Sequence, residues 1–332
     1  MDWSKGFSAA YYMEAVDPVT WQDRQRIEVT GGSVSRTASG LRQSADVSCT
    51  EFQPDTELWV RIYLEASQGG ETERAALFTG LASVPDTEIS GTLRRYPLAC
   101  YSVLKPLEDV ILQRGYYVLA GTDCASALRE LLAATPAPAV IEGQAPTLYQ
   151  TIIAEGGETP LSMAGRILDA IGWRMRIDGD GTIRIGPRGE TETAAFGIYN
   201  DVIEPQLKLR SDWFACPNVF RATSGDLTAT ARDDSPDSPL STVRRGREIW
   251  MAEDSVKLAE GEGLQQYAER RLMEEQARAT SVQYTRRFDP AVNVGDVIRL
   301  HYPGQGLMGL YTVSSQSITL GAGATVSEEV KK

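Results

Sequence analysis

Apolar and polar residues alternate over short stretches near both ends of this sequence, and this alternation limits the folds that the chain can adopt. In ELWVRIYLEA, a strand would place Leu58, Val60, Ile62 and Leu64 on one face and Trp59, Arg61, Tyr63 and Glu65 on the other. A period of two is typical of a half-buried strand. RIEVTGGSVSR, SADVSCTEF and AALFTGLASV complete a strand-rich region with short polar connections. Strands at this spacing predict an antiparallel barrel or sandwich over residues 1–95.

A helical spacing replaces the alternation from about Tyr96. Apolar residues recur at helical intervals in VLKPLEDVILQR and in TDCASALRELLAA, where Asp123 or the threonine before it can cap the helix and TPAPA ends it. TPLSMAGRILDAIG predicts another helix, with Pro160 in its first position and Gly172 as its stop. WRMRI, the turn DGDG and TIRIG then predict a hairpin. Residues 96–195 are therefore expected to form an α+β insert domain.

Strand patterns return in FGIYNDVIEPQLKLR, NVFRATSGDLTATARD and STVRRGREIW. The longest helical window, residues 253–280, follows them and is weakened at Gly261 and Gly263. VGDVIRLHY and LYTVSSQSITL predict a closing strand pair. The expected fold class is α+β, mainly β. Two β-barrel domains, residues 1–95 and 196–332, would flank the inserted α/β domain of residues 96–195, and the second barrel would carry the long helix near 253–280.

Composition excludes several classes of protein. The chain has 332 residues, of which 42% are hydrophobic and 23% charged, so it can bury a core. Its 33 Lys and Arg against 45 Asp and Glu give a net charge of -12, and no local basic patch is evident, which disfavours sequence-general nucleic-acid binding. The first twenty residues lack an apolar core, and no window approaches 18 uninterrupted apolar residues. Neither a signal peptide nor a membrane segment is expected, so synthesis would be in a bacterial cytoplasm without secretion.

The cysteines do not form a metal motif. Cys49, Cys100, Cys124 and Cys216 are separated by tens of residues, without a CxxC pair, and the chain has one histidine. Cys49 and Cys100 lie in alternating or apolar runs, where a reduced, buried thiol is the ordinary occupant. All four are interpreted as inert core thiols.

Two glycine-rich strings resemble ligand-binding loops, but the residues around them do not fit the motifs. Residues 304–309, GQGLMG, match the dinucleotide fingerprint, but a strand pattern follows where that motif requires a helix. Asp178-Gly179-Asp180-Gly181 resembles the start of a calcium loop, but Thr182, Ile183 and Gly189 occupy positions five, six and twelve. Hairpin turns are the better interpretation of both strings.

No catalytic constellation is evident. His301 lies in VIRLHY, where alternation places it with Arg299 opposite the buried face. The carboxylate pairs Glu253-Asp254 and Glu274-Glu275 fall in the helical window, where a solvated face explains them better than a glycosidase site. The chain is therefore expected not to be an enzyme, and no catalytic, cofactor-binding or metal residues are assigned. Alanine at His301, Asp178 or Asp180 is expected to leave function largely intact.

The order of features, more than any single motif, resembles a known family. The strand-rich start, LFTGLAS, YPLACYSVLKPLEDVILQRGYYVLAGTDCASALRELL and the closing VGDVIRLHYPGQGLMGLYTVSSQSITL together resemble the baseplate hub proteins of bacteriophage tails and contractile injection systems. The opening MDWSKGFSAAYYMEAVDPVTWQDRQRIEVTGGSVSR also looks like the start of short hub proteins of prophages in Gram-positive bacteria.

This resemblance implies a structural virion protein at the tail tip. It implies a homotrimer of two-barrel chains with pseudo-six-fold symmetry, which joins the tail tube or distal tail protein to a central spike or fibre protein, near the tape measure protein. DNA would pass through the channel without specific binding. The alternative is a carbohydrate-binding or carbohydrate-active tail protein, such as a tail-associated lysin or depolymerase, in which Trp3, Trp21 and Trp59 stack on sugars. Barrel packing is the simpler explanation of these tryptophans.

Overall fold

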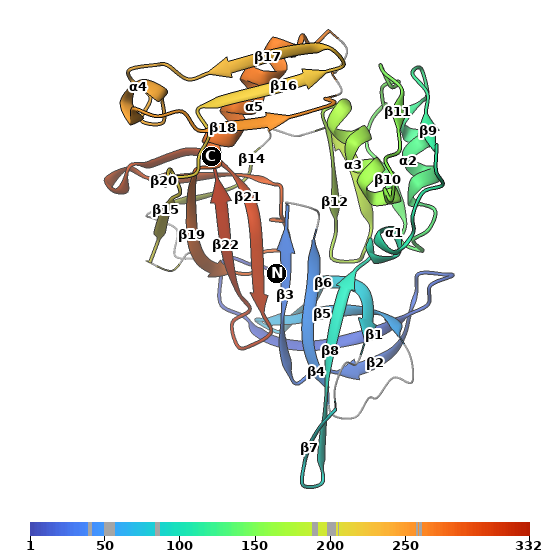
Figure 1. The fold of residues 1–332 in the computed structure, drawn as a ribbon. Helices are drawn as coiled ribbons and strands as arrows, with labels where there is room; N and C mark the ends of the chain where they lie inside the picture. The colour runs from blue at the N-terminus through green and yellow to red at the C-terminus, as the bar shows by residue number, and fades with distance from the viewer. Residues whose placement is uncertain are drawn as a thin grey trace.

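A large, mostly antiparallel sheet forms the centre of the protein (Figure 1). The computed structural model describes residues 1–38, 42–49, 57–83, 87–187, 192–197, 204, 206–256, 258 and 261–332. The N-terminal strands are β1 (Ser8–Val16), β2 (Asp23–Glu28), β3 (Gly31–Thr37), β4 (Gln43–Cys49), β5 (Leu58–Gln68), β6 (Glu71–Ser83), β7 (Glu88–Ser90) and β8 (Leu93–Ser102). The C-terminal strands are β14 (Glu192–Gly197), β15 (Lys208–Ser211), β19 (Thr280–Arg287), β20 (Val297–Tyr302), β21 (Leu307–Thr319) and β22 (Thr325–Lys331).

The two halves of the chain share this sheet through β3 and β21. These strands pair antiparallel, with Ser35 opposite Ser317, and the main path of strands runs openly from β15 to β2. A closed barrel requires its first and last strands to pair. An N-terminal barrel would close if β3 paired with β2, the strand at the other end of the N-terminal series. In the described residues, β3 instead pairs with β4 on one side and with β21 on the other. The mainly β, α+β class is confirmed, whereas two separate closed barrels are not.

Strand β5 is buried on both faces, contrary to the half-buried strand that its alternation predicts. Leu64 and Ile62 enter a core that also contains Ile318 and Val326 from the C-terminal half. The other face carries Arg61, which is only 6% exposed. Periodicity alone missed this second covered face because its side chains are polar or amphipathic.

The insert packs beside one end of the sheet (Figure 1). Its elements are α1 (Lys105–Asp109), β9 (Tyr117–Val118), α2 (Cys124–Leu132), β10 (Ala139–Ile141), β11 (Ile152–Ile153), α3 (Pro160–Ala170), β12 (Trp173–Ile177) and β13 (Ile183–Pro187). The expected helices and hairpin are present. Asp123 caps α2 by accepting from the backbone N–H groups of its first turn, and Pro160 begins α3.

The expected start of the insert was wrong in detail. Residues from Tyr96 continue β8 to Ser102, because Tyr96 pairs with Cys49 of β4 in the sheet. VLKPLEDVILQR forms only the short helix α1, since Val110 is already extended.

A smaller sheet and helix lie beyond the C-terminal strands. β16 (Val219–Ser224), β17 (Leu227–Arg232), α4 (Thr242–Arg245), β18 (Trp250–Glu253) and α5 (Leu264–Ala277) form this unit, and the short 3-10 turn η2 (Pro303–Gln305) links β20 to β21. α5 packs on β16 and β17 through a core that includes Phe220, Ala268 and Leu272. In Figure 1 this unit lies at the opposite end of the sheet from the β7 hairpin.

Two local expectations need correction in this unit. STVRRGREIW forms α4, capped by Ser241, before it becomes strand β18. The helix expected near 253–280 spans Leu264–Ala277, because Glu253 pairs with β16 and Gly261 has a φ of 79°. Part of FGIYNDVIEPQLKLR, namely 198–203 and 205, lies outside the described residues.

Candidate functional site: the charged junction between insert and sheet

The turn between β12 and β13 docks directly on the central sheet. The carbonyl oxygen of Gly179 accepts from Oγ1 of Thr79 at 2.8 Å, and that of Asp180 accepts from Nη2 of Arg61 at 3.0 Å and from Nε1 of Trp21 at 3.2 Å. A Cβ atom at Gly179 would lie 1.8 Å from the carbonyl oxygen of Ala76 in β6. The DGDG turn therefore needs glycine for close backbone approach between the two parts.

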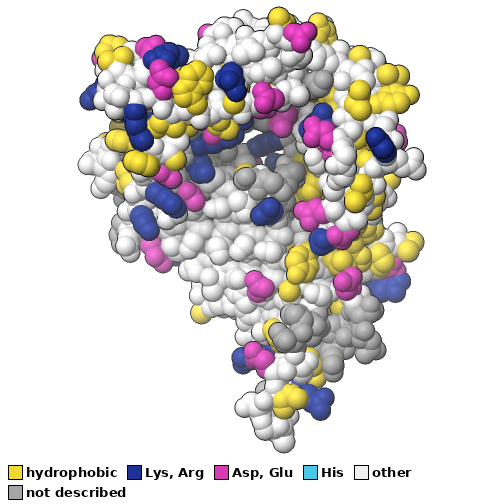
Figure 2. Space-filling model, viewed as in Figure 1, with side chains coloured by type: hydrophobic (Ala, Val, Ile, Leu, Met, Phe, Trp, Pro, Cys, Tyr) yellow, Lys and Arg dark blue, Asp and Glu magenta, His cyan; other side chains and the backbone are white. Residues whose placement is uncertain are grey.

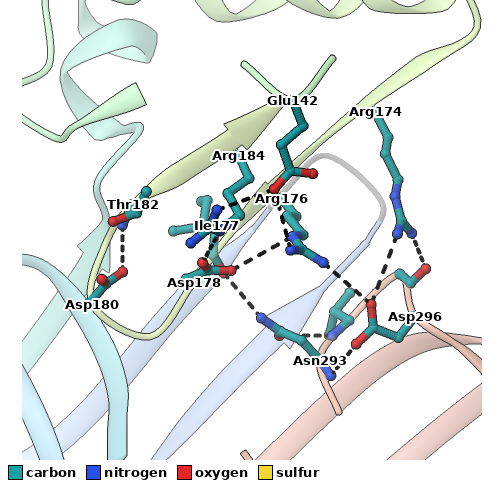
Figure 3. Close-up of polar contacts among 12 residues, drawn as sticks. Glu142, Arg174, Arg176, Ile177, Asp178, Asp180, Thr182, Arg184, Asn293 and Asp296 are labelled. Atoms are coloured by element: carbon teal, nitrogen blue, oxygen red, sulfur yellow. Dashed lines mark hydrogen bonds and ion pairs between the residues drawn. The ribbon is translucent and has the colours of Figure 1, made fainter. Parts of the chain in front are cut away.

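Charged side chains of the insert surround this docked turn (Figure 3). Arg184 binds Asp178 through Nε and Glu142 through Nη1, the latter at 3.2 Å. Arg176 lies between three carboxylates, at 3.7 Å from oxygens of Glu142, Asp178 and Asp296. These separations exceed hydrogen-bond length. The three carboxylates therefore balance the charge of Arg176 without accepting hydrogen bonds from its N–H groups.

The loop before β20 completes the junction from the side of the sheet. Oδ2 of Asp296 accepts from the backbone N–H of Asn293 at 2.8 Å, and Nη1 of Arg174 donates to the carbonyl oxygen of Gly295. Nδ2 of Asn293 and Nε2 of Gln43 both donate to the carbonyl oxygen of Ile177, at 3.4 and 2.9 Å. Burial raises the pKa of the Asp296 carboxyl above its ordinary value, although nearby arginines oppose this shift. These contacts hold β4, β12 and the loop before β20 in one arrangement.

A cavity of about 590 Å³ adjoins this junction. Its walls come from β3, β4, β12, the C-terminal end of α5, the loop 293–295, the start of β20, β21 and the end of β22. Figure 2 shows a hollow between the insert and the rest of the molecule, with Lys and Arg side chains around it. This volume lies within the usual range of small-ligand sites.

A buried polar chain connects the cavity with the core of the sheet. Nη1 of Arg36, in the cavity wall, donates to Oδ1 of Asn293 at 3.1 Å and lies 3.5 Å from Oε1 of Gln316. Nε2 of Gln316 donates to Oε1 of Glu328 at 2.7 Å. Glu328 also binds Arg286, so four buried polar side chains follow one another across β3, β21, β22 and β19.

The residues and strings that the sequence brought forward as candidates lie apart from one another. His301 is exposed on β20, opposite Met308, as its alternation predicts. GQGLMG forms η2 and the start of strand β21, as the strand pattern after it predicts. Glu253 accepts from the hydroxyl of Tyr267, while Glu274 and Glu275 pair with arginines. Among the described residues, no group of His, Cys, Asp and Glu could hold a metal ion; Gly189 lies outside them.

The cysteines and the three candidate sugar-stacking tryptophans lie in packed regions. All four cysteines are buried and none forms a disulfide, and burial raises the pKa of Cys100 to about 12 and that of Cys124 to about 11. Trp3 packs edge-on against Phe7 and Phe288. Trp21 and Trp59 contact each other beside the core of the insert. These tryptophans therefore serve packing inside the molecule.

The arginines of the junction were not among the candidates that the sequence brought forward. Arg174, Arg176 and Arg184 alternate with apolar residues in WRMRI and TIRIG, so a polar face of the hairpin was visible in the sequence. This face meets Asp296 and Gly295, more than a hundred residues away, and no local pattern encodes that contact.

Two apolar patches remain exposed on the outer surface. The insert patch consists of Tyr117, Leu119, Tyr149 and Ile153, and Tyr117 lies opposite Ile153 in the pair of β9 and β11. The α4 patch consists of Trp213, Phe214 and Val243. Arg245 donates to the carbonyl oxygens of Trp213 and Phe214, at 2.5 and 3.0 Å, and fixes that loop against α4. In Figure 1 the elements that carry the two patches lie on opposite sides of the molecule.

Comparison with solved structures identifies the fold. A tail protein from Neisseria meningitidis superposes with a TM-score of 0.72 at 14% identity, covering 99% of this chain and 97% of that one. The 43 kDa tail protein of prophage MuSo2 from Shewanella oneidensis gives 0.71 at 15%, covering 97% and 96%. Prophage tail protein gp18 from Listeria monocytogenes gives 0.57 at 12%, covering 97% and 94%. The predicted resemblance to phage tail proteins is therefore confirmed at the level of the fold, over nearly the whole chain.

No family model and no curated protein matches the sequence. Within the described part of the chain, no helix has the length and apolar character needed to cross a membrane.

Proposed function

We propose that the protein is a structural component of a phage tail tip, a baseplate hub that joins the tail tube to a central spike or fibre. The observation that carries this proposal is the fold, which matches tail proteins over 97% and 99% of the chain. Agreement over nearly the full length of both chains supports a shared architecture, rather than a single shared module. The proposed location is the tail tip of a virion that assembles in the bacterial host.

The exposed patches support assembly with other copies of the chain. The insert patch and the α4 patch differ in sequence and lie on opposite sides of the molecule. Contact between two different patches is heterologous, and such contacts build a ring when the rotation between copies closes. In a trimeric ring, the N-terminal and C-terminal strands of the three copies would together present six strand-rich regions to a six-fold tube. Apolar patches of this kind are typical of protein interfaces.

The proposed partners follow from this position in the tail. One face of the ring would contact the tail tube or distal tail protein, and the other the spike or fibre protein, with the tape measure protein nearby. A net charge of -12 per chain favours a channel that does not retain DNA.

A structural role agrees better with the packing than a carbohydrate-active one. Trp3, Trp21 and Trp59 contact other aromatic rings of the chain, so their faces are not arranged as a sugar platform. Incubation with host cell-wall material should release no reducing sugar. Sugar release by the purified chain would favour the alternative of a lysin or depolymerase.

The patches can be tested by charge substitution. Ile153→Asp and Phe214→Asp each place a charge in one proposed contact, and each should abolish association of the chain in the presence of its tube and spike neighbours, as measured by light scattering. Ile89→Asp, on the exposed β7 hairpin, is the matched control and should assemble normally. Normal ring formation by both patch variants would overturn these contacts.

A further inference from the structure

The cavity beside the junction has more positive charge than its surroundings neutralise. Six of its lining residues are Lys or Arg and one is Glu: Arg36, Arg174, Arg176, Arg278, Lys331 and Lys332, with Glu274. The carboxylates of the junction lie beside Arg174 and Arg176, and Glu275 pairs with Arg278 at 2.5 Å. Glu274 already accepts from two arginines outside the cavity wall, at 2.9 and 2.8 Å.

Three of the six cationic side chains in the cavity wall have no carboxylate partner of this kind in the described part of the chain. Across the described ranges, no carboxylate lies within ion-pair distance of Arg36, Lys331 or Lys332. Arg36 is only 5% exposed, and its contacts are neutral oxygens of Asn293, Gln316 and Leu77. A buried cation without a paired counter-charge is costly, and the Asp178 carboxylate, which lies beyond ion-pair distance, compensates the charge of Arg36 only in part.

Hydrogen-bond donors in the wall are also unused. Nε of Arg36 is buried and has no hydrogen-bond partner among the described residues, and Nε of Arg176 is buried with Oδ1 of Asp178 at 3.7 Å, beyond hydrogen-bond length. Guanidinium groups are planar donors that match the geometry of carboxylate and phosphate oxygens. Burial lowers the pKa of Arg36 to about 10, although the Asp178 carboxylate opposes that shift, and a further anion in the cavity would oppose it more.

We propose that this cavity is an oxyanion site, which takes a phosphate or a carboxylate between Arg36, Arg176 and Lys331. The oxyanion would supply the missing counter-charge and bridge β3, β12 and the end of β22. It would therefore strengthen the contact between the insert and the sheet. This inference does not depend on the role in a phage tail.

The oxyanion could come from a free ion or from an acidic protein segment, and one experiment distinguishes the two. Inorganic phosphate represents a free oxyanion, and a short polyglutamate peptide represents an acidic segment of a neighbouring protein. Each is titrated into the full-length chain by isothermal calorimetry, and the thermal midpoint is measured in parallel, with sodium chloride at matched ionic strength as the screening control. Saturable binding of either probe should raise the midpoint with concentration. The probe that binds more tightly identifies the source.

Variants locate the site. Lys331→Ala should weaken binding about tenfold, since one charge-assisted contact is lost. Arg36→Gln should weaken it at least as much, and Lys331→Ala keeps the test valid if the buried Arg36 variant does not fold. Arg129→Ala, which removes an exposed charge from α2, is the matched control and should bind as the parent does. Absence of saturable binding by both probes, or equal binding by Lys331→Ala and the parent, would overturn the proposal.

Discussion

Nη2 of Arg286 lies 2.5 Å from Oε1 of Glu328, and neither side chain has any exposed surface. The pair joins β19 to β22 in the interior of the C-terminal strands, where Thr285 pairs with Ser327 and Arg286 with Val326 in the ladder. Glu328 also accepts from Gln316, which leads on to Arg36 at the cavity. Removing one charge of such a pair leaves the other buried without compensation.

We therefore expect Glu328→Gln to lower the free energy of unfolding by about 3–5 kcal/mol, because the Arg286 charge stays buried. Urea unfolding measures this loss. Glu329→Gln, the next position on the same strand, is the control and should change stability by less than about 0.5 kcal/mol. Equal stability of the Glu328→Gln variant and the parent would show that the pair contributes little.

The docked turn gives a second prediction. Gly179→Ala should lower stability by at least about 2 kcal/mol, since its Cβ would lie 1.8 Å from the backbone oxygen of Ala76. Gly165→Ala, inside α3 with open space around it, is the matched control and should be neutral or slightly stabilising. Limited proteolysis should also show faster cleavage between insert and sheet in the Gly179 variant. A Gly179→Ala protein as stable as the parent would contradict the close approach.

Stability should depend on pH through Glu274. Burial alone would raise the pKa of its carboxyl, but hydrogen bonds from Arg271 and Arg270 outweigh burial and hold the pKa below its ordinary value of 4.5. A carboxyl with a lowered folded pKa stabilises the fold above its unfolded pKa, and that contribution is lost as pH falls through the folded pKa. Glu274→Gln should thus cost about 1–3 kcal/mol at neutral pH and progressively less in acid.

The control for this pH profile is Glu269→Gln, an exposed position on the same helix whose carboxylate accepts from Gln265 at 2.9 Å. Its profile should follow that of the parent. A constant difference between Glu274→Gln and the parent across the acid range would rule out the linkage.

The cysteines should be unreactive in the folded protein. Burial raises the pKa of Cys100 to about 12 and that of Cys124 to about 11. These thiols therefore stay protonated at mildly alkaline pH, and they are also shielded from reagents by the surrounding residues. A chromogenic disulfide reagent should titrate no thiol of the native chain and all four after denaturation. Rapid reaction of a native cysteine would contradict the packing.

Local sequence patterns predicted the local elements of the fold. Asp123 and Pro160 marked the starts of α2 and α3, and alternation placed His301 on the outer face of β20. These features depend on capping and periodicity, which act over a few residues. Where a local signal competed with tertiary pairing, pairing prevailed, as when Tyr96 continued β8 and Glu253 joined β18.

The candidate site was less accessible to sequence reasoning. Its arrangement depends on contacts between residues far apart in the chain, such as Arg36 with Asn293 and Arg174 with Gly295. The pairing of β3 with β21, which joins strands from the two halves of the chain in one sheet, is of the same kind. An isolated arginine in a strand predicts an exposed charge, and only the folded chain shows that Arg36 is buried.

The proposed role as a tail-tip hub is tested most directly by electron microscopy of the purified chain assembled with its tube and spike neighbours. We predict a ring of three copies around the tail axis, between tube and spike, with the insert patch of one copy against the α4 patch of the next. A chain that remains monomeric in the mixture by light scattering, and that contributes no density between tube and spike, would contradict the hub assignment.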